Sequence, residues 1–179
     1  AAGTTTDDAL TIVHGGASAV DSINGQTLIS TDFESITLDT TGTGAAGAQT
    51  VGAIAMTAST GGTTSFNLTG SNSVTIAATT ANVIDASGLT GTTGVTMNAA
   101  AVGVTTITGS AGIDALIGDA SSTINGGGGV DTITGGSGND VINGDAGNDI
   151  IDSNAGTDTV NAGAGNDTVN ISTDADIGS

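Results

Sequence analysis

The stretch GGGGVDTIT GGSGNDVIN GDAGNDIID SNAGTDTVN AGAGNDTVN occupies residues 126–170 and consists of five lines of nine residues. In every line the fourth residue is glycine, the sixth is aspartate and the eighth is Ile or Val. Five consecutive lines in the same register are not a chance pattern. They predict one structural unit, repeated along the chain.

Each line predicts a turn of six residues followed by a strand of three. Glycine suits the turn because it takes positive φ without a Cβ clash and lets backbone carbonyls converge on an ion. Strand side chains alternate between faces, so the aliphatic residue points inward while Thr, Asn and Asp beside it point outward. The inward residues are then Ile133, Ile142, Ile151, Val160 and Val169.

The recurring aspartates predict a metal site. In a coil with two strands per turn, repeat n stacks on repeat n+2 at roughly 4.8 Å. This predicts Asp131 over Asp149 over Asp167 on one side, and Asp140 over Asp158 on the other. Unit charges at that spacing repel by roughly 1 kcal/mol in bulk water and by about 3–4 kcal/mol at an effective dielectric near 20. The chain has no Lys or Arg to relieve this repulsion.

A hard divalent cation with six or more oxygen ligands relieves it, and calcium fits better than magnesium, which prefers a rigid octahedron and retains waters. The chain has no Cys and one His, which disfavours zinc and copper. The alternative is that the aspartates simply favour turns, but the nine-residue phasing favours the metal. Backbone carbonyls of the turn glycines are expected to complete the shell: Gly127, Gly129, Gly136, Gly138, Gly147, Gly156, Gly163 and Gly165.

The pattern resembles the G-G-x-G-x-D-x-U-x repeat of the RTX (repeats-in-toxin) family. This resemblance implies an all-β fold, a parallel β-solenoid or β-roll with short strands and glycine-rich calcium-binding turns. It also implies export from a Gram-negative cell by type I secretion and an extracellular or cell-surface location. The resemblance is specific over about residues 109–170 and weak elsewhere.

The repeat register extends upstream of residue 126. Gly109–Ile117 is a good repeat that carries Asp114, which is expected to stack over Asp131. Gly118–Asn125 is one residue short and lacks the sixth-position aspartate, so Asp119 is a weak substitute ligand. Together the repeats predict about four to five calcium ions.

The chain before the repeats is rich in Thr, Ala and Gly, and contains short alternating runs such as Ser35–Asp39 and Ser65–Thr69. These runs predict strands with one buried face. Their spacing predicts that the coil continues at about 18–21 residues per turn without ligands, with outward Thr and Asn forming hydrogen-bonded ladders. We therefore expect a degenerate solenoid over 1–107, a calcium-binding roll over 108–171 and a tail over 172–179.

Two degenerate repeats near the start contain Asp8 and Asp21. The sequence leaves open whether these aspartates bind metal, and the simpler interpretation is that they are turn residues.

Composition excludes several function classes. The 179 residues carry a formal net charge of −18, with no Lys, Arg, Pro or Cys. Such a chain is repelled by nucleic acid and by anionic membrane surfaces, and it has no apolar run of the roughly 20 residues that a membrane span needs. The single His and single Glu form no recognisable catalytic arrangement, so no enzyme is expected.

Two functions remain open. The first is an extracellular structural protein that self-assembles into a surface layer or fibre, since the order and composition of its parts resemble Gram-negative surface-layer and secreted matrix proteins. The second is a folding or secretion module of a larger type I-secreted toxin, protease or adhesin. The expected partners are calcium and further copies of the chain, through end-to-end or lattice contacts.

Overall fold

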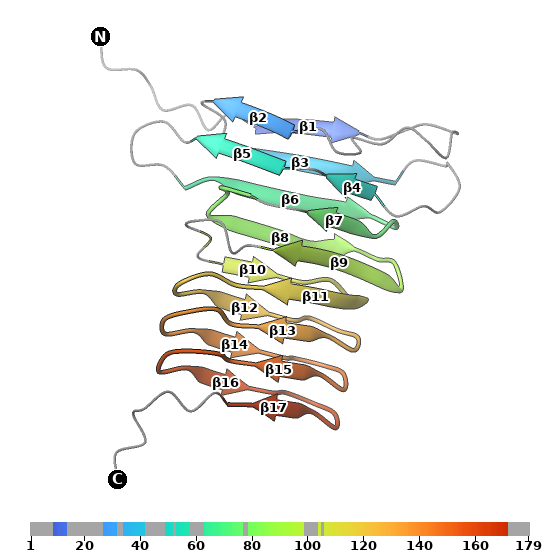
Figure 1. Cartoon of the computed structure of the whole chain (residues 1–179). Coiled ribbons are helices and arrows are strands. Elements are labelled where there is room, and N and C mark those ends of the chain that lie inside the picture. Colours follow the sequence, from blue (N-terminus) through green and yellow to red (C-terminus); the bar gives the residue numbers. More distant parts are fainter. Residues whose placement is uncertain are drawn as a thin grey trace.

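The structure, a computed structural model, describes residues 9–13, 27–31, 34–41, 49–51, 53–57, 63–76, 79–98, 104 and 106–171. Over these residues the chain is an all-β, parallel β-solenoid, as predicted (Figure 1). It winds downward in flat turns from β1 toward β17, and most turns place one strand in each of two sheets.

Two long parallel sheets form the sides of the coil in the part of the chain that the structure describes. The first contains eight strands: β1 (Ala9–Val13), β3 (Ser35–Thr40), β6 (Ser65–Gly70), β8 (Val83–Leu89), β10 (Thr106–Thr108), β12 (Thr123–Asn125), β14 (Val141–Asn143) and β16 (Thr159–Asn161). The second contains seven: β4 (Gln49–Val51), β7 (Val74–Ile76), β9 (Thr93–Asn98), β11 (Ile113–Ile117), β13 (Thr132–Thr134), β15 (Ile150–Asp152) and β17 (Thr168–Asn170). A separate pair comprises β2 (Thr27–Thr31) and β5 (Ala53–Thr57).

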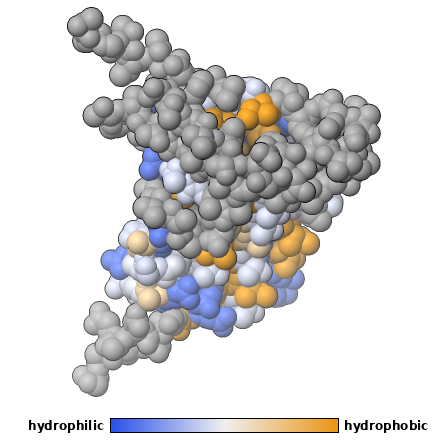
Figure 2. All heavy atoms as spheres, turned by 45° about the horizontal axis from the view of Figure 1, so that its top comes forward, coloured by the Kyte–Doolittle hydropathy of each residue, from blue (hydrophilic) through white to orange (hydrophobic). Residues whose placement is uncertain are grey.

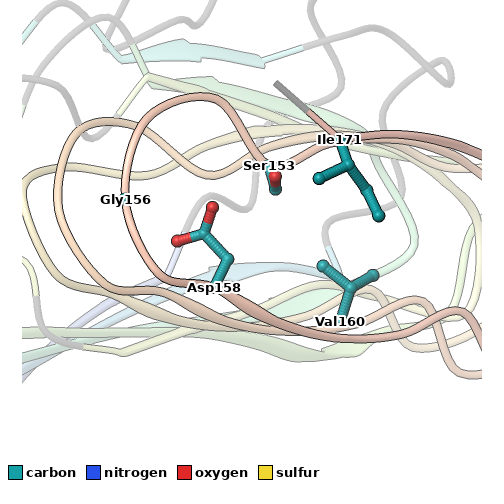
Figure 3. Close-up of a pocket in the computed structure, with 5 residues that line it drawn as sticks. All are labelled: Ser153, Gly156, Asp158, Val160 and Ile171. Atoms are coloured by element: carbon teal, nitrogen blue, oxygen red, sulfur yellow. The ribbon is translucent and has the colours of Figure 1, made fainter. Parts of the chain in front are cut away.

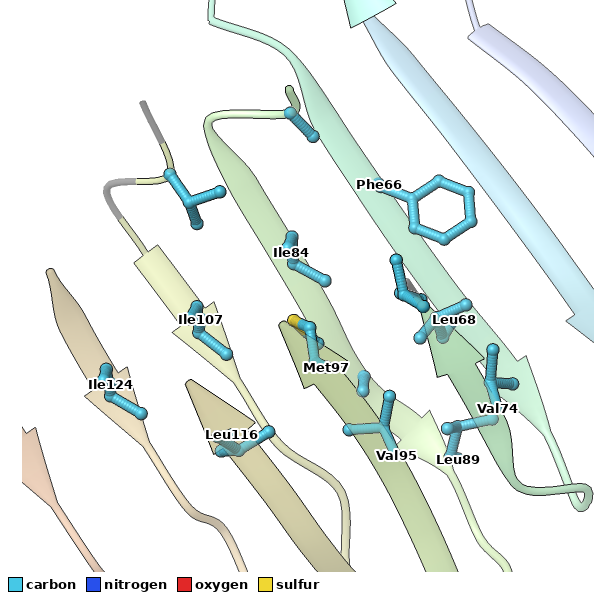
Figure 4. Packing of buried hydrophobic residues seen from close by; sticks show 14 of the residues in the cluster. Phe66, Leu68, Val74, Ile84, Leu89, Val95, Met97, Ile107, Leu116 and Ile124 are labelled. Atoms are coloured by element: carbon cyan, nitrogen blue, oxygen red, sulfur yellow. The ribbon is translucent and has the colours of Figure 1, made fainter. Parts of the chain in front are cut away.

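The core is a narrow file of aliphatic side chains between the two sheets. Ile107 and Ile124 from one sheet lie across from Leu116 of the other (Figure 4), and all are fully buried. Ile133, Ile142 and Ile151 continue this file, which confirms the predicted inward position. Val160 is only partly buried and Val169 is 37 % exposed, because β16 and β17 are the last strands of their sheets in the described residues.

The strand register confirms the stacking of repeat n on repeat n+2. Residues 18 apart are partners from β12 to β14 and from β13 to β15, including Ile124 with Ile142 and Ile133 with Ile151. The predicted length of 18–21 residues per turn is wrong near the start of the chain. There Ala9 pairs with Ser35 and Ser35 with Ser65, so these turns are 26 and 30 residues long.

The coil is continuous where the sequence predicts a change of domain. β10 pairs with β8 on one side and with β12 on the other, so hydrogen-bonded strands connect the acid-poor part to the repeats. The domain boundary between residues 107 and 108 remains a prediction, which rests on the change in composition.

Outward-facing polar side chains form the predicted ladders in at least two places. Asn143 Nδ2 donates to Asn125 Oδ1 at 2.8 Å, and Asn67 Nδ2 donates to Ser35 Oγ at 3.0 Å. These bonds join neighbouring coils without any metal.

The outer surface toward the C-terminal end mixes hydrophilic and apolar residues (Figure 2). Exposed aliphatic side chains there include Ile113, Val130, Val141 and Ile150. The described residues contain no helix long and apolar enough to cross a membrane.

Candidate metal centre

The repeat turns are shaped by two backbone positions of positive φ. Numbering each repeat from 1 to 9, position 4 is glycine throughout, for example Gly129 with φ 119° and Gly138 with φ 105°. Position 2 also has positive φ, but Asp145 (68°) and Asn154 (58°) replace glycine there in two repeats. Asp and Asn tolerate this left-handed region better than other side chains. The turns of these five repeats therefore follow the same path, and each turn stacks on the turn two repeats later.

The position-6 aspartates form two columns on opposite edges of the coil. Column I contains Asp114, Asp131, Asp149 and Asp167; column II contains Ser122, Asp140 and Asp158. In column I the backbone N–H of Asp114 donates to Asp131 Oδ1 at 2.8 Å. The N–H of Asp131 donates to Asp149 Oδ1, and the N–H of Asp149 donates to Asp167 Oδ1, both at 2.9 Å.

Column II repeats this hydrogen-bond pattern. The N–H of Ser122 donates to Asp140 Oδ1 at 2.7 Å, and the N–H of Asp140 donates to Asp158 Oδ1 at 2.9 Å. The structure thus brings together the aspartates that the sequence placed in each column.

One oxygen of three column aspartates is buried without a partner. Asp131, Asp140 and Asp149 are at most 1 % exposed, and each uses Oδ1 to accept a backbone N–H. Their Oδ2 atoms accept no hydrogen bond. A buried carboxylate oxygen without a donor is costly because desolvation is not offset. A bound cation or a proton at these three atoms would offset that cost.

The position-1 glycine of the same repeat packs closely against each orphan oxygen, with no room for a Cβ. A Cβ added to Gly126 would lie 2.8 Å from Asp131 Oδ2 and 2.6 Å from the carbonyl oxygen of Gly144. A Cβ on Gly135 would lie 2.7 Å from Asp140 Oδ2 and 2.6 Å from the carbonyl oxygen of Ser153. We call this closely packed position the position-1 cradle. It is bounded by one carboxylate oxygen and one carbonyl oxygen from the next coil.

Gly144 forms the third cradle, where an added Cβ would lie 2.7 Å from Asp149 Oδ2 and would also contact the carbonyl oxygen of Ala162. Calcium binds oxygens at about 2.3–2.6 Å. The carboxylate and carbonyl oxygens that meet at all three cradles are the kind of donor that this ion prefers.

The turn carbonyls differ in availability. Within the described residues, the position-4 carbonyls of Gly129, Gly138 and Gly147 accept no hydrogen bond. The position-2 carbonyls of Gly127 and Gly136 already accept the N–H groups of Ala146 and Ala155.

Among the glycines that the sequence singled out, those at position 4 are accordingly the better oxygen donors: Gly129, Gly138, Gly147, Gly156 and Gly165. The glycines at position 2 are Gly127, Gly136 and Gly163. Sequence reasoning did not single out the position-1 carbonyls of Gly144, Ser153 and Ala162, because it expected backbone ligands only at the glycines of positions 2 and 4.

Asp114 differs from the aspartates below it. Its carboxylate accepts hydrogen bonds from the N–H of Val95, the N–H of Ser110 and the hydroxyl of Ser110. Ser110 N lies 2.7 Å from Asp114 Oδ2. The protein itself therefore satisfies both oxygens of Asp114.

The structure places Ser122 in column II above Asp140, and Asp119 outside it. The N–H of Asp119 donates to Ser122 Oγ at 3.0 Å, and Asp119 lies at position 2 of its shortened turn. Because the missing residue shortens this turn, the strand register brings Ser122 to the column position.

Farther up the same sheet, Thr64 N donates to Asn82 Oδ1 at 3.1 Å, with the same 18-residue spacing. Asn82 thus continues the hydrogen-bonding role of the column without its charge, and only the strand register could reveal this. Asp8 and Asp21 lie outside the described residues.

The surroundings of Asp158 differ from those of Asp131, Asp140 and Asp149. A pocket there is lined by Ser153, Gly156, Asp158, Val160 and Ile171 (Figure 3). Ser153 takes position 1 in place of glycine, and its buried hydroxyl has no hydrogen-bond partner. The Asp158 carboxylate and the Ser153 hydroxyl supply oxygen atoms to this pocket, and two of the five lining side chains are aliphatic.

In the ion-free fold, burial raises the pKa of several column aspartates. Desolvation raises the pKa of Asp131 from 3.8 to about 7, and the charges of Asp114, Asp149 and Asp145 add to this rise. Burial also raises the pKa of Asp114, Asp140 and Asp149, against the lowering effect of their backbone hydrogen bonds. Each direction indicates that ionised carboxylates in the columns lack a counter-charge.

The geometry supports binding of a hard cation. The described residues contain no group of three or more His, Cys, Asp or Glu side chains that could hold a metal on their own. An ion in the columns must therefore take backbone oxygens as well, and the cradle supplies one such carbonyl beside each orphan carboxylate oxygen. Oxygen-only coordination of this kind is typical of calcium.

Comparison with known proteins agrees with this site. A family profile of the RTX calcium-binding nonapeptide repeat, in four copies, matches residues 120–151 and 134–169. Neither a curated protein nor a solved structure matches the chain significantly.

Proposed function

We propose that this chain, whose residues 120–169 match the RTX calcium-binding nonapeptide repeat, is an extracellular structural protein. Calcium stabilises its solenoid, and the chain assembles with further copies into a surface layer or fibre. The observation that carries this proposal is the pair of aspartate columns. Calcium between the coils converts like-charge repulsion into attraction, so the ion acts as part of the core.

The proposal assigns the ion to the column aspartates Asp131, Asp140, Asp149, Asp158 and Asp167, with turn carbonyls completing the shell. Asp114 belongs to the same column by position. The proposed role is structural, because the ion would join stacked coils.

Self-assembly is proposed from charge and from strand edges. The chain has a formal charge of −18 without a single Lys or Arg, so copies repel each other until cations bind. Edge strands that remain monomeric are commonly protected by Lys or Pro, and this sequence contains neither. Calcium can therefore promote association after it has promoted folding.

Folding is tested by circular dichroism of the whole chain during a calcium titration that begins in EGTA. We expect a weaker β signal with a low melting temperature in EGTA and a cooperative gain of β signal, with a midpoint of about 10⁻⁴–10⁻³ M as for extracellular calcium modules. A β spectrum that is equally strong and heat-stable in EGTA would contradict the calcium-stabilised function.

Assembly is tested by static light scattering in the same titration. We expect the mass to rise at calcium concentrations above those needed for folding. A folded chain that stays monomeric at tens of millimolar calcium would favour a second function, a folding or secretion module of a larger type I-secreted protein. The profile match to one segment, 120–169, is consistent with that module.

A further inference from the structure

We infer that the coils formed by β6 to β9 keep their fold without calcium and act as a template on which the repeats fold and acquire their register. We call these strands, which span residues 65–98, the seed. The inference rests on the proposed function in one respect, namely that the repeats need calcium for full stability. It goes beyond that function because it assigns a role to a part of the chain outside the matched repeats.

The seed buries more apolar surface per coil than the repeats do. Residues 65–82 and 123–140 each form one coil of the same length, because Ser65 pairs with Val83 and Thr123 pairs with Val141. Among the described residues, the first coil buries Phe66, Leu68, Val74 and Ile76, while the second buries Ile124 and Ile133. Figure 4 shows Phe66, Leu68 and Val74 between the sheets. Since both coils order the same number of residues, apolar burial offsets more of the entropy cost in the seed.

The same two coils differ in chain entropy and in charge. Residues 65–82 contain one glycine and no acidic residue, whereas residues 123–140 contain seven glycines and the two aspartates Asp131 and Asp140. Glycine loses more conformational freedom on folding than any other residue. Both aspartates are buried, which is costly for a carboxylate without a counter-charge. The repeat coil therefore costs more to order although it buries less, and only this coil depends on a cation.

Neutral side chains join the coils of the seed to their neighbours. Asn82 Oδ1 accepts both the backbone N–H and the hydroxyl of Thr64, each at 3.1 Å. At a second corner, Thr40 Oγ1 donates to the carbonyl of Thr69 at 2.9 Å, and Asn72 Nδ2 donates to the carbonyl of Thr40 at 2.9 Å. None of these bonds involves an ionised group, so removal of calcium leaves them intact.

Hydrogen-bonded strands lead directly from the seed into the repeats. β8 pairs with β10 and β10 with β12 in the first sheet, while β9 pairs with β11 and β11 with β13 in the second. This continuity matters because nearly identical lines of nine residues can pair in more than one register, and a slip by two repeats keeps every inward side chain inward. A preformed seed fixes the first pairing, and each further coil then has a folded neighbour on which to stack.

Hydrogen exchange of the whole chain, measured by mass spectrometry of its peptides, tests the inference. In EGTA, peptides from 65–98 should exchange more slowly than peptides from 120–169. Calcium at about ten times Kd should slow exchange in the repeats by at least about tenfold, and it should change exchange in the seed much less. A seed that exchanges as fast as the repeats in EGTA, with both protected in calcium, overturns the inference and leaves the proposed function intact. Repeats that are equally protected in EGTA and in calcium overturn the proposed function itself.

A pair of variants tests the template role without altering any aspartate. Leu68 is fully buried in the seed, so Leu68→Ala should speed exchange there in EGTA and raise the calcium midpoint of the β-signal gain severalfold. Thr75→Ala is the matched control, because Thr75 is the partly buried residue between Val74 and Ile76 in β7, and it should leave both quantities unchanged. A Leu68→Ala chain in which the seed exchanges no faster, or in which the calcium midpoint stays at the unmodified value, overturns the inference.

Discussion

At the scale of single residues, each of Asp131, Asp140 and Asp149 performs two separable tasks. Its Oδ1 accepts a backbone N–H from the coil above, and its second oxygen supplies negative charge to the cradle. Asn82 performs the first task alone, since its Oδ1 accepts the N–H of Thr64. The hydrogen bond thus extends beyond the repeats, while the charge at the column position is restricted to them.

This separation predicts opposite effects of Asp149→Asn in the absence and presence of calcium. Without calcium, removal of one charge from a repelling column should raise stability by roughly 1 kcal/mol. With calcium at about ten times Kd, loss of one site should lower stability by about 1.4 kcal/mol. Thermal melts in EGTA and in calcium measure both. Asp149→Ala, which also removes the accepting oxygen, should be less stable than Asp149→Asn in both conditions.

The raised pKa of Asp131 predicts an acid-stabilised ion-free fold. Its pKa is about 7 in the fold and near 3.8 in an unfolded chain, so the folded state retains a proton that the unfolded state releases between these values. The contribution of this group to stability is fully present below about pH 4 and is lost as pH rises to about 7.

We therefore expect the calcium-free chain to melt at a higher temperature at pH 5 than at pH 8. Calcium binds the ionised carboxylate, so its apparent affinity should change in the opposite direction and weaken at pH 5. A melting temperature in the absence of calcium that rises from pH 5 to pH 8 would contradict this assignment.

At the scale of elements, the three-residue strands depend on one inward side chain each. Ile142 is the central residue of β14 and is fully buried, while its neighbour Val141 is 42 % exposed. Ile142→Ala should cost about 2–5 kcal/mol through lost burial and a cavity. Val141→Ala should change stability by less than about 0.5 kcal/mol. Chemical denaturation in saturating calcium compares the two variants.

The sequence predicted the elements from β12 to β17 well, because one nine-residue pattern encodes both turn and strand. The inward Ile133 and the column order follow from that pattern and the two-residue alternation of strands. The longer turns above β6 could not be predicted, because no motif marks which Thr- and Ala-rich runs become partners. Ile36 pairs with Phe66, for example, and not with Ile54.

Part of the candidate site could not be predicted from the sequence either. The capture of Asp114 by Ser110 depends on a local contact that the repeat pattern does not specify. The close packing of the first glycine against the next coil appears only after the coils are stacked.

At the scale of the whole molecule, each coil contacts mainly its two neighbours, so stability should be nearly a sum over coils. Duplication of residues 126–143 adds one complete turn, with copies of Asp131 and Asp140. We expect the longer chain to fold in calcium and to bind two more ions, as measured by equilibrium dialysis. Insertion of four residues at the same point should instead break the register and lower the calcium affinity.

Because repeat n stacks on repeat n+2, the aspartates are divided between two edges of the coil, and this division has a mechanical consequence. The two columns lie on opposite edges of a flat coil, and column I holds two cradles, at Asp131 and Asp149, while column II holds one, at Asp140. Each bound ion pulls adjacent coils together at its own edge. Calcium at these cradles would therefore shorten the two edges unequally, and we expect the solenoid axis to bend toward column I as the sites fill.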